Sequence, residues 1–259
     1  MATVTLTTDF GISDPFVGIM KGVLASRAPA ARVIDVTHAI PPQDVLAGAL
    51  VLRHAAPFFP PGTIHVAVVD PGVGTARRAL CVETTRALFV GPDNGVLTLA
   101  AEAAEVRRIV HVTDERFFLS PRSTTFHGRD VFAPVAAALA TGTPAPALGP
   151  AATGMRRVAL PAVTKEGSGL RAEVIYVDGF GNLVTNVSHD MLPSGPVAIR
   201  LGSAYIRGIA PSYATVAPGQ PLAVVNSWGL LEIAVREGSA RTALGGGVGA
   251  LVIVEPAAP

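Results

Sequence analysis

The sequence predicts an α/β fold: an N-terminal domain whose mainly parallel sheet is flanked by helices, followed by an all-β, barrel-like C-terminal domain. Three observations indicate this. Strand and helix patterns alternate through residues 1–150, as in β-α-β units. Residues 141–169 are rich in Ala, Gly, Pro and Thr without a sustained apolar period, so we place a linker at 151–169. Across residues 170–259, short strand patterns alternate with turns, which is typical of a small antiparallel barrel.

In the first domain, short apolar runs predict strands, and apolar residues at helical spacing predict helices. The first helix carries Pro15 in its first turn, where proline is favoured. The predicted strands are 4–9, 31–37, 64–69, 79–84, 86–91 and 107–112. The predicted helices are 15–28, 42–56, 94–103 and 128–142. Such alternation implies a sheet covered by helices on both faces.

The second domain shows strands at close spacing with a single short helical pattern. The predicted strands are 170–178, 182–187, 196–201, 221–228, 230–236 and 249–255. A helix is predicted over 238–244, where the following glycine-rich segment caps its end.

Composition limits the classes of function. Hydrophobic residues make up 49% of the 259 and charged residues 15%, which suggests surface buried between subunits. The formal net charge is +1 without a Lys/Arg cluster, so nucleic acid is not an expected partner. No apolar run reaches the roughly 18 residues that span a bilayer, and we expect a cytoplasmic protein without a membrane partner. The one cysteine, Cys81, excludes an internal disulfide.

The most informative segment is VDPGVGTAR, because an apolar strand delivers Asp70 directly into a glycine-containing turn. Ligands of open α/β sheets bind beyond the carboxyl ends of strands. Asp9 ends a strand that should lie nearby, and Arg77 can fold back over the same edge. Two carboxylates there suit a polyhydroxyl or cationic ligand. The alternative is an ordinary Asp-Pro-Gly turn.

Three other residues of the first domain have competing interpretations. Asp14 precedes a helix and fits an N-cap, and Asn94 fits a cap of the helix that follows it. His127 stands at a helix entry beside an aromatic residue and is either structural or catalytic. The histidines show no metal-ligand spacing, so no metal is expected. The glycine loop after Asp70 leads into a strand instead of a helix, which argues against phosphate binding.

In the second domain, polar residues lie beside strand ends. Asn182 and Ser227 hold such positions, and an amide can read an adenine edge through paired donor and acceptor groups. Glu232 is a carboxylate in an otherwise apolar strand, either functional or facing solvent.

Taken together, six motifs resemble the S-adenosylmethionine hydrolases, also called S-adenosylmethionine hydroxide adenosyltransferases, which are relatives of fluorinase and chlorinase. The motifs span almost the whole chain in the family's order: TTDFGISDPFVGIMKG, VDPGVGTARR, GPDNG, FHGRDVFAP, DGFGNLVTN and NSWGLLEIAV. The resemblance implies a trimer, with S-adenosylmethionine held between the N-terminal domain of one subunit and the C-terminal domain of its neighbour. No cofactor is implied, since S-adenosylmethionine is the substrate.

The resemblance also implies roles for residues of the first domain. Asp9 resembles the carboxylate that binds both ribose hydroxyls, and Asp14 the one near the methionine ammonium. Asp70, Arg77 and His127 resemble the triad of the members that use water, with Asp70 or His127 as the base. The halogenases have tyrosines in place of Asp70 and His127.

For the second domain, the resemblance makes Asn182 the residue that reads adenine, with Phe180 packing beside it. Ser227 falls where the methionine carboxylate is bound, and the main chain from Val235 to Glu237 where adenine is met. Trp228 replaces an arginine of the fluorinase near that carboxylate, and Glu232 lies in the same strand with its role open.

The function implied is hydrolysis of S-adenosyl-L-methionine to adenosine and L-methionine by attack of water on C5′. Two alternatives remain. One is a halide-using 5′-halo-5′-deoxyadenosine synthase, against which the Asp-Arg-His set argues. The other is a non-catalytic protein that binds S-adenosylmethionine or adenosine.

Overall fold

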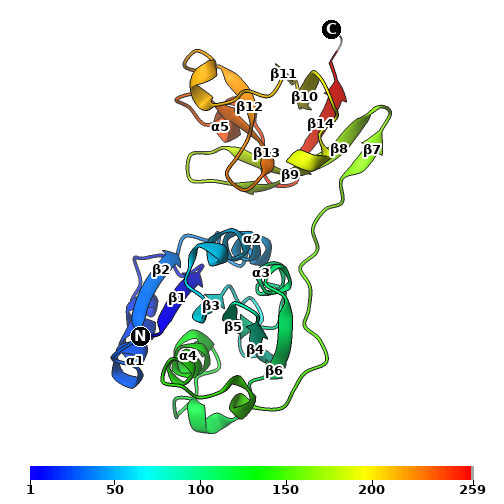
Figure 1. Ribbon diagram of the computed structural model, residues 1–259. Coiled ribbons are helices and arrows are strands. Elements are labelled where there is room, and N and C mark those ends of the chain that lie inside the picture. The colour runs from blue at the N-terminus through cyan, green and yellow to red at the C-terminus, as the bar shows by residue number, and fades with distance from the viewer. Residues whose placement is uncertain (258–259) are drawn as a thin grey trace. The chain divides into compact units, whose positions relative to one another are not determined.

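The computed structural model describes residues 1–257, which divide into two compact units, Met1–Ala159 and a second that starts at Leu160 (Figure 1). The predicted fold class is confirmed in both units. The first is a layered α/β unit and the second is built from antiparallel strands. None of the helices in the described residues is long and apolar enough to cross a membrane.

The first unit is built on a six-stranded sheet in the order β2-β1-β3-β5-β4-β6. Its strands are β1 (Thr3–Thr8), β2 (Arg32–Thr37), β3 (Thr63–Val68), β4 (Ala79–Thr84), β5 (Ala87–Pro92) and β6 (Val106–His111). The first four in spatial order run parallel, and β4 runs antiparallel to both neighbours. The tight β4–β5 hairpin causes this reversal. Strand β3 is buried along its whole length, so the centre of the sheet is packed on both faces.

Helices cover the two faces of this sheet (Figure 1). They are α1 (Phe16–Arg27) with α4 (Ala133–Ala140), and α2 (Val45–Ala55) with α3 (Thr98–Ala103). A π-helical turn, Gly128–Phe132, leads into α4. Helix α2 starts later than the predicted residue 42, because a turn over Pro41–Asp44 precedes it and Asp44 is its N-cap.

The second unit is an eight-stranded antiparallel sheet that is nearly closed. The strand order is β11-β10-β14-β8-β9-β13-β12, with β7 paired to β8. The strands are β7 (Thr164–Glu166), β8 (Gly169–Val177), β9 (Leu183–Ser188), β10 (Val197–Leu201), β11 (Ala204–Arg207), β12 (Pro221–Val225), β13 (Leu230–Val235) and β14 (Leu251–Pro256). The short α5 is Ala240–Leu244. Apolar side chains such as Ile199, Leu231 and Val252 fill its core.

Sequence patterns missed two strands of the second unit. Strand β7 lies in the segment interpreted as a linker, and β11 forms a hairpin with β10 across a two-residue turn. Both are too short and too exposed to show alternation. Single 3₁₀ turns occur at Ala56–Phe58, Glu115–Phe117, Ala145–Leu148, His189–Met191 and Tyr213–Thr215.

The chain after helix α4 is fastened to the first unit. Buried Asp93 accepts a hydrogen bond from Arg156 N (2.6 Å), and Arg78 bridges Asp93 and the carbonyl of Gly154 (2.7 Å). Val158 N donates to Thr98 Oγ1 (3.4 Å). These contacts explain why the first unit continues to Ala159.

Candidate active site

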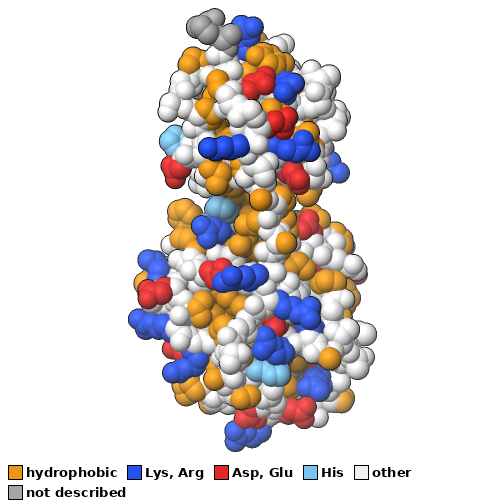
Figure 2. Space-filling view, turned by 90° about the vertical axis from the view of Figure 1, so that its right-hand side faces the viewer, with side chains coloured by type: hydrophobic (Ala, Val, Ile, Leu, Met, Phe, Trp, Pro, Cys, Tyr) orange, Lys and Arg blue, Asp and Glu red, His pale blue; other side chains and the backbone are white. Residues whose placement is uncertain are grey.

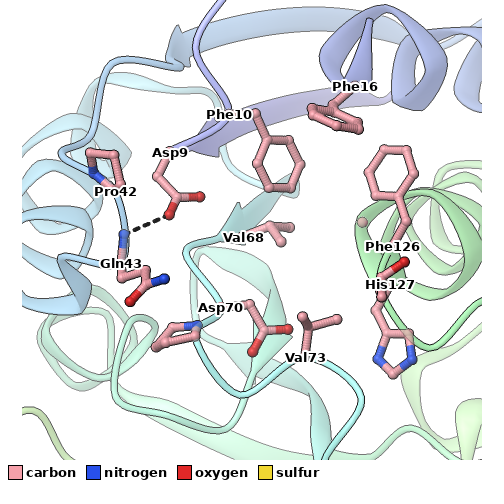
Figure 3. A pocket seen from close by; sticks show the side chains of 13 residues that line it. Asp9, Phe10, Phe16, Pro42, Gln43, Val68, Asp70, Val73, Phe126 and His127 are labelled. Carbon is pink, nitrogen blue, oxygen red and sulfur yellow. Dashed lines mark hydrogen bonds between the residues drawn. The ribbon is translucent and has the colours of Figure 1, made fainter. Parts of the chain in front are cut away.

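A cavity of about 390 Å³ opens at the carboxyl ends of β1 and β3 (Figure 3). These strands are parallel neighbours with Thr8 opposite Val68, so the residues that follow them emerge at one edge. The sequence expectation that Asp9 and Asp70 converge is therefore met. The cavity is lined by Asp9, Phe10, Phe16, Pro42, Gln43, Val68, Asp70, Pro71, Val73, Thr125, Phe126, His127 and Gly128.

Asp70, Arg77 and His127 form one hydrogen-bonded group. Arg77 Nε donates to both carboxylate oxygens of Asp70 (3.0 Å each), and Nη2 donates to Oδ2 at 2.5 Å. The same Nη2 lies 2.8 Å from His127 Nδ1. The Asp70 and Arg77 side chains are only 5% and 8% exposed, so this ion pair is shielded from solvent and fixed in place. The Asp-Pro-Gly turn offered as the alternative is present as well, closed by a hydrogen bond from Val73 N to the carbonyl of Asp70 (3.2 Å), so the turn and the ion pair occur together.

The loop that carries Asp70 has little freedom. Gly74 has φ +77°, and a Cβ there would lie 2.4 Å from the carbonyl oxygen of Thr124, so only glycine lets the two segments meet. Asn94 Nδ2 donates to the carbonyl of Val69 (2.8 Å), which anchors the residue just before Asp70. The prediction that Asn94 caps a helix is wrong, because α3 begins only at Thr98 and has no side-chain cap.

The hydrogen bond to Arg77 determines the state of His127. A guanidinium only donates, so Nδ1 must accept and the neutral ring carries its proton on Nε2. Burial and the positive charge of Arg77 lower the pKa of His127 below its ordinary value of 6.5. His127 is thus suited to donate from Nε2, whereas Asp70 can only accept.

Asp9 is held more loosely. Its Oδ2 accepts a hydrogen bond from Gln43 N (2.8 Å), and the carboxylate is half-buried. Figure 3 shows the other oxygen directed into the hollow. This oxygen is available to a hydroxyl donor of a ligand.

Three phenylalanines form an apolar wall that the sequence analysis did not assign to the site. Phe10, Phe16 and Phe126 contact one another edge to face, with ring centroids 5.2 to 5.9 Å apart. Phe10 and Phe126 are next to the predicted site residues Asp9 and His127, and Phe16 follows Pro15 at the predicted helix start. This proximity is the one feature of the sequence that pointed to them. The wall lowers the local polarity opposite the two carboxylates (Figure 3).

Asp14 has no capping role. The N-cap position of α1 is Pro15, and no side chain caps the helix, so the N-cap interpretation of Asp14 is wrong. Asp14 is exposed and does not line the cavity. Since a proline carries no N–H at the helix start, less capping is required there.

The second unit has a pocket of about 470 Å³ that contains Ser227, Trp228 and Glu232. Glu232 is 3% exposed, so its interpretation as a solvent-facing residue is wrong. Its carboxylate accepts hydrogen bonds from Tyr213 OH (2.7 Å) and Asn226 Nδ2 (3.0 Å). Burial and this carboxylate raise the pKa of Tyr213 to about 12. Glu232 thereby fixes the amide that supports the turn before β13.

Asn182 lies in a tight turn with Asp178, which lines the same pocket. Asn182 Nδ2 donates to Asp178 Oδ2 (2.9 Å), so this amide has one proton left for a ligand. Phe180 in this turn is 82% exposed. Val235 is buried, and Glu237 is exposed with φ +55°; neither lines the pocket.

Within residues 1–257, no group of three or more His, Cys, Asp or Glu is placed to hold a metal ion. Figure 2 shows Lys and Arg interspersed with Asp and Glu on the face it presents.

The chain is similar to curated proteins, solved structures and protein families. A curated relative named (R)-S-adenosyl-L-methionine hydrolase, from Salinispora tropica, is 45% identical over 245 residues, covering 93% of each chain. A protein of that name from Thermus thermophilus is 42% identical and covers 95% of this chain and 96% of its own. Fluorinase from Actinoplanes sp. is more distant, at 26% identity over 89% of this chain and 90% of its own.

A solved structure of an uncharacterized conserved protein from Thermotoga maritima superposes with a TM-score of 0.89. Its identity is 35%, covering 98% of this chain and all of the other. Two family descriptions match the sequence: SAM hydroxide adenosyltransferase N-terminal domain over residues 4–149, and SAM hydroxide adenosyltransferase C-terminal domain over residues 172–253. The chain therefore belongs to the SAM hydroxide adenosyltransferase family.

Proposed function

We propose that this protein hydrolyses S-adenosyl-L-methionine to adenosine and L-methionine. The observation that carries the proposal is the Asp70–Arg77–His127 group at the cavity wall. Relatives that share up to 46% identity with the chain are named (R)-S-adenosyl-L-methionine hydrolase. The Asp70 carboxylate favours water over a halide, because a halide beside it would be repelled by the like charge, whereas water can donate a hydrogen bond to it.

The reaction is an in-line displacement at C5′. A water molecule gives a proton to the Asp70 carboxylate as its oxygen bonds to C5′, and the C5′–S bond breaks with its electron pair on sulfur. The products are neutral adenosine, methionine and one proton. Asp70 is the base in this proposal, because the His127 nitrogen that faces Arg77 is already an acceptor and the other carries the proton. His127 Nε2 holds the water by donating to its oxygen.

Arg77 and the phenylalanines prepare the site for this step. Arg77 keeps the carboxylate oriented before water arrives, and preorganised groups of this kind contribute roughly 10²- to 10⁴-fold to the rate. The wall of Phe10, Phe16 and Phe126 disfavours the sulfonium ground state more than the transition state, in which positive charge leaves sulfur.

The binding roles implied by the resemblance extend the proposal. Asp9 holds the ribose hydroxyls, and Asp14 lies near the methionine ammonium. Asn182 reads adenine beside Phe180 and the main chain from Val235 to Glu237. The Phe180 ring is 82% exposed and so is free to pack against a ligand. Ser227, with Trp228 beside it, meets the methionine carboxylate, and Glu232 supports their turn through Asn226.

The assembly proposed is a cytoplasmic homotrimer in which residues of both units contribute to each site, without metal or cofactor. Its support is the apolar composition and the exposure of large side chains such as Ile12, Phe58 and Phe180. Light scattering of the active protein is expected to give three times the monomer mass. Active monomers would contradict the shared site.

Product analysis tests the reaction. Purified protein incubated with S-adenosylmethionine, with and without chloride, is expected to form adenosine and methionine in equal amounts, unaffected by chelator. In ¹⁸O-water the label is expected on the 5′-oxygen of adenosine. A halogenated nucleoside would show a halide-using synthase instead of a hydrolase. Binding without turnover would show a non-catalytic binding protein.

A further inference from the structure

Gln43 occupies a turn position that ordinarily suits glycine. A hydrogen bond from Asp44 N to the carbonyl of Pro41 (3.0 Å) closes a turn whose central residues are Pro42 and Gln43, and Gln43 has φ +65°. A positive φ at this position of a type II turn favours Gly or Asn, because a longer side chain crowds the backbone. A glutamine kept in this conformation points to a role for its side chain.

The side chain lines the cavity on the same wall as Asp9. Figure 3 shows the Gln43 side chain below the Asp9 carboxylate on the same side of the hollow, and both residues line the hollow. The turn itself is fixed, because Gln43 N donates to Asp9 Oδ2 (2.8 Å) and Asp44 accepts from Ala47 N (2.9 Å) at the start of α2. The amide is therefore presented from a rigid support.

Asp9 alone can accept the hydrogen bonds that two neighbouring hydroxyls donate, but it cannot donate to their oxygens. An ionised carboxylate accepts hydrogen bonds, whereas each hydroxyl both donates one and accepts others. One carboxylate oxygen is also already bonded to the Gln43 N–H. The Gln43 side chain adds an N–H donor and a carbonyl acceptor at the same wall. The two residues together can therefore accept from the hydroxyl hydrogens of a diol and donate to its oxygens.

We infer that Gln43 is a specificity-determining residue that reads the ribose 2′,3′-diol together with Asp9. The identity of the ribose rests on the proposed function. Gln43 contacts substrate through its side chain and holds Asp9 through its backbone N–H.

Gln43→Gly tests the side chain without disturbing the backbone. Glycine accepts φ +65° without strain and keeps the N–H that bonds to Asp9. The melting temperature is expected to stay level or rise, while KM for S-adenosylmethionine rises about 3- to 10-fold, as expected for a lost neutral hydrogen bond, and kcat changes little. An unchanged KM would overturn the inference.

Nucleoside binding identifies the group that Gln43 reads. Calorimetry with the intact protein compares adenosine, 2′-deoxyadenosine and 3′-deoxyadenosine. Wild type is expected to prefer adenosine, and Gln43→Gly is expected to lose most of the preference over at least one deoxynucleoside. If both preferences persist in the variant, Gln43 does not read the diol, whatever its effect on KM.

Glu105→Gly is the matched control. Glu105 also has a positive φ (57°), but it follows helix α3 and does not line the cavity. This variant is expected to gain the same backbone relief with no change in KM or nucleoside preference. Hydrolysis by wild type is measured first, so that failure of the proposed function is recognised separately from failure of the inference.

Discussion

Asp9 and Asp70 follow neighbouring parallel strands of one sheet and line one cavity, yet their surroundings differ. The Asp70 side chain is 5% exposed and accepts three hydrogen bonds from Arg77, whose charge it neutralises. Asp9 is half-buried and accepts one hydrogen bond, from the backbone of Gln43. No salt bridge to Asp9 is formed within the described residues.

The difference separates two tasks that carboxylates perform at a sheet edge. A carboxylate locked by a buried guanidinium keeps its position whether or not ligand is present, which suits a group that acts on a reacting atom. A carboxylate with an unoccupied oxygen gains its partner only on binding, which suits recognition. We therefore expect substitution of Asp70 to affect turnover and substitution of Asp9 to affect binding.

The largest expected effect is on kcat in Asp70→Asn. An amide keeps the size of the side chain but cannot take a proton, so kcat is expected to fall about 10²-fold or more, while KM changes little. Steady-state kinetics at saturating S-adenosylmethionine measures it. If kcat is unchanged, the 70–77 loop has a structural role only and another residue must act as the base.

Asp93→Asn is the control for the structural cost of this change. Asp93 is also a buried carboxylate paired with an arginine, Arg78, and it lies outside the cavity. Loss of either charge leaves an arginine without its partner, so both variants are expected to melt at a lower temperature. Only Asp70→Asn is expected to lose turnover.

A smaller effect is expected on binding in Asp9→Ala. Loss of the carboxylate removes the acceptor for the ribose hydroxyls, at a cost of about 1–3 kcal/mol in binding free energy. Calorimetric titration with adenosine measures it. Asp9→Asn keeps an oxygen for Gln43 N and is expected to lose less than Asp9→Ala. If Asp9→Asn loses no affinity, Asp9 acts only through the turn, whereas equal losses would mean that the second carboxylate oxygen carries the whole effect.

Local sequence rules predicted the strands that carry these carboxylates. Strand β3 is a continuous apolar run, and β1 pairs with it in register, so the convergence of Asp9 and Asp70 followed from sheet physics. The position of Arg77 over Asp70 was also expected, since seven residues with two glycines allow the chain to return. The substrate, the reaction and the role of each site residue, in contrast, were predicted from the family resemblance.

The environments of three polar residues could not be predicted from local sequence, because they depend on contacts with distant parts of the chain. Asn94 reads as a helix cap, but its amide bonds to Val69, a residue that only the folded sheet brings near. The sequence left Glu232 as either functional or solvent-facing; it is buried and accepts a hydrogen bond from Tyr213, 19 residues earlier in the chain. Gln43 carries no local signal at all, because a positive φ on a glutamine depends on the Pro41–Asp44 turn and on Asp9.

The smallest expected effect concerns pH, and it tests the third member of the Asp70 group. His127 faces Arg77, Arg122, Asp70 and Asp130, and burial with the arginine charge lowers its pKa below 6.5. Protonation would place a hydrogen on Nδ1 and break the bond to Arg77. Activity is therefore expected to be retained at neutral pH and lost as pH falls through the lowered pKa, so that more than half of the plateau rate remains at pH 6.5.

The pH dependence of kcat, recorded where the protein stays folded, checks this expectation. Buried His65, whose pKa is lowered to about 4, makes the folded state less stable as pH falls below the ordinary value of 6.5, so folding is monitored at each point. His127→Asn offers Arg77 an amide oxygen that does not titrate. If His127 causes the acidic limb, this variant has a lower rate but a flatter profile; an unaltered limb, or a midpoint above 6.5, would assign it to another group.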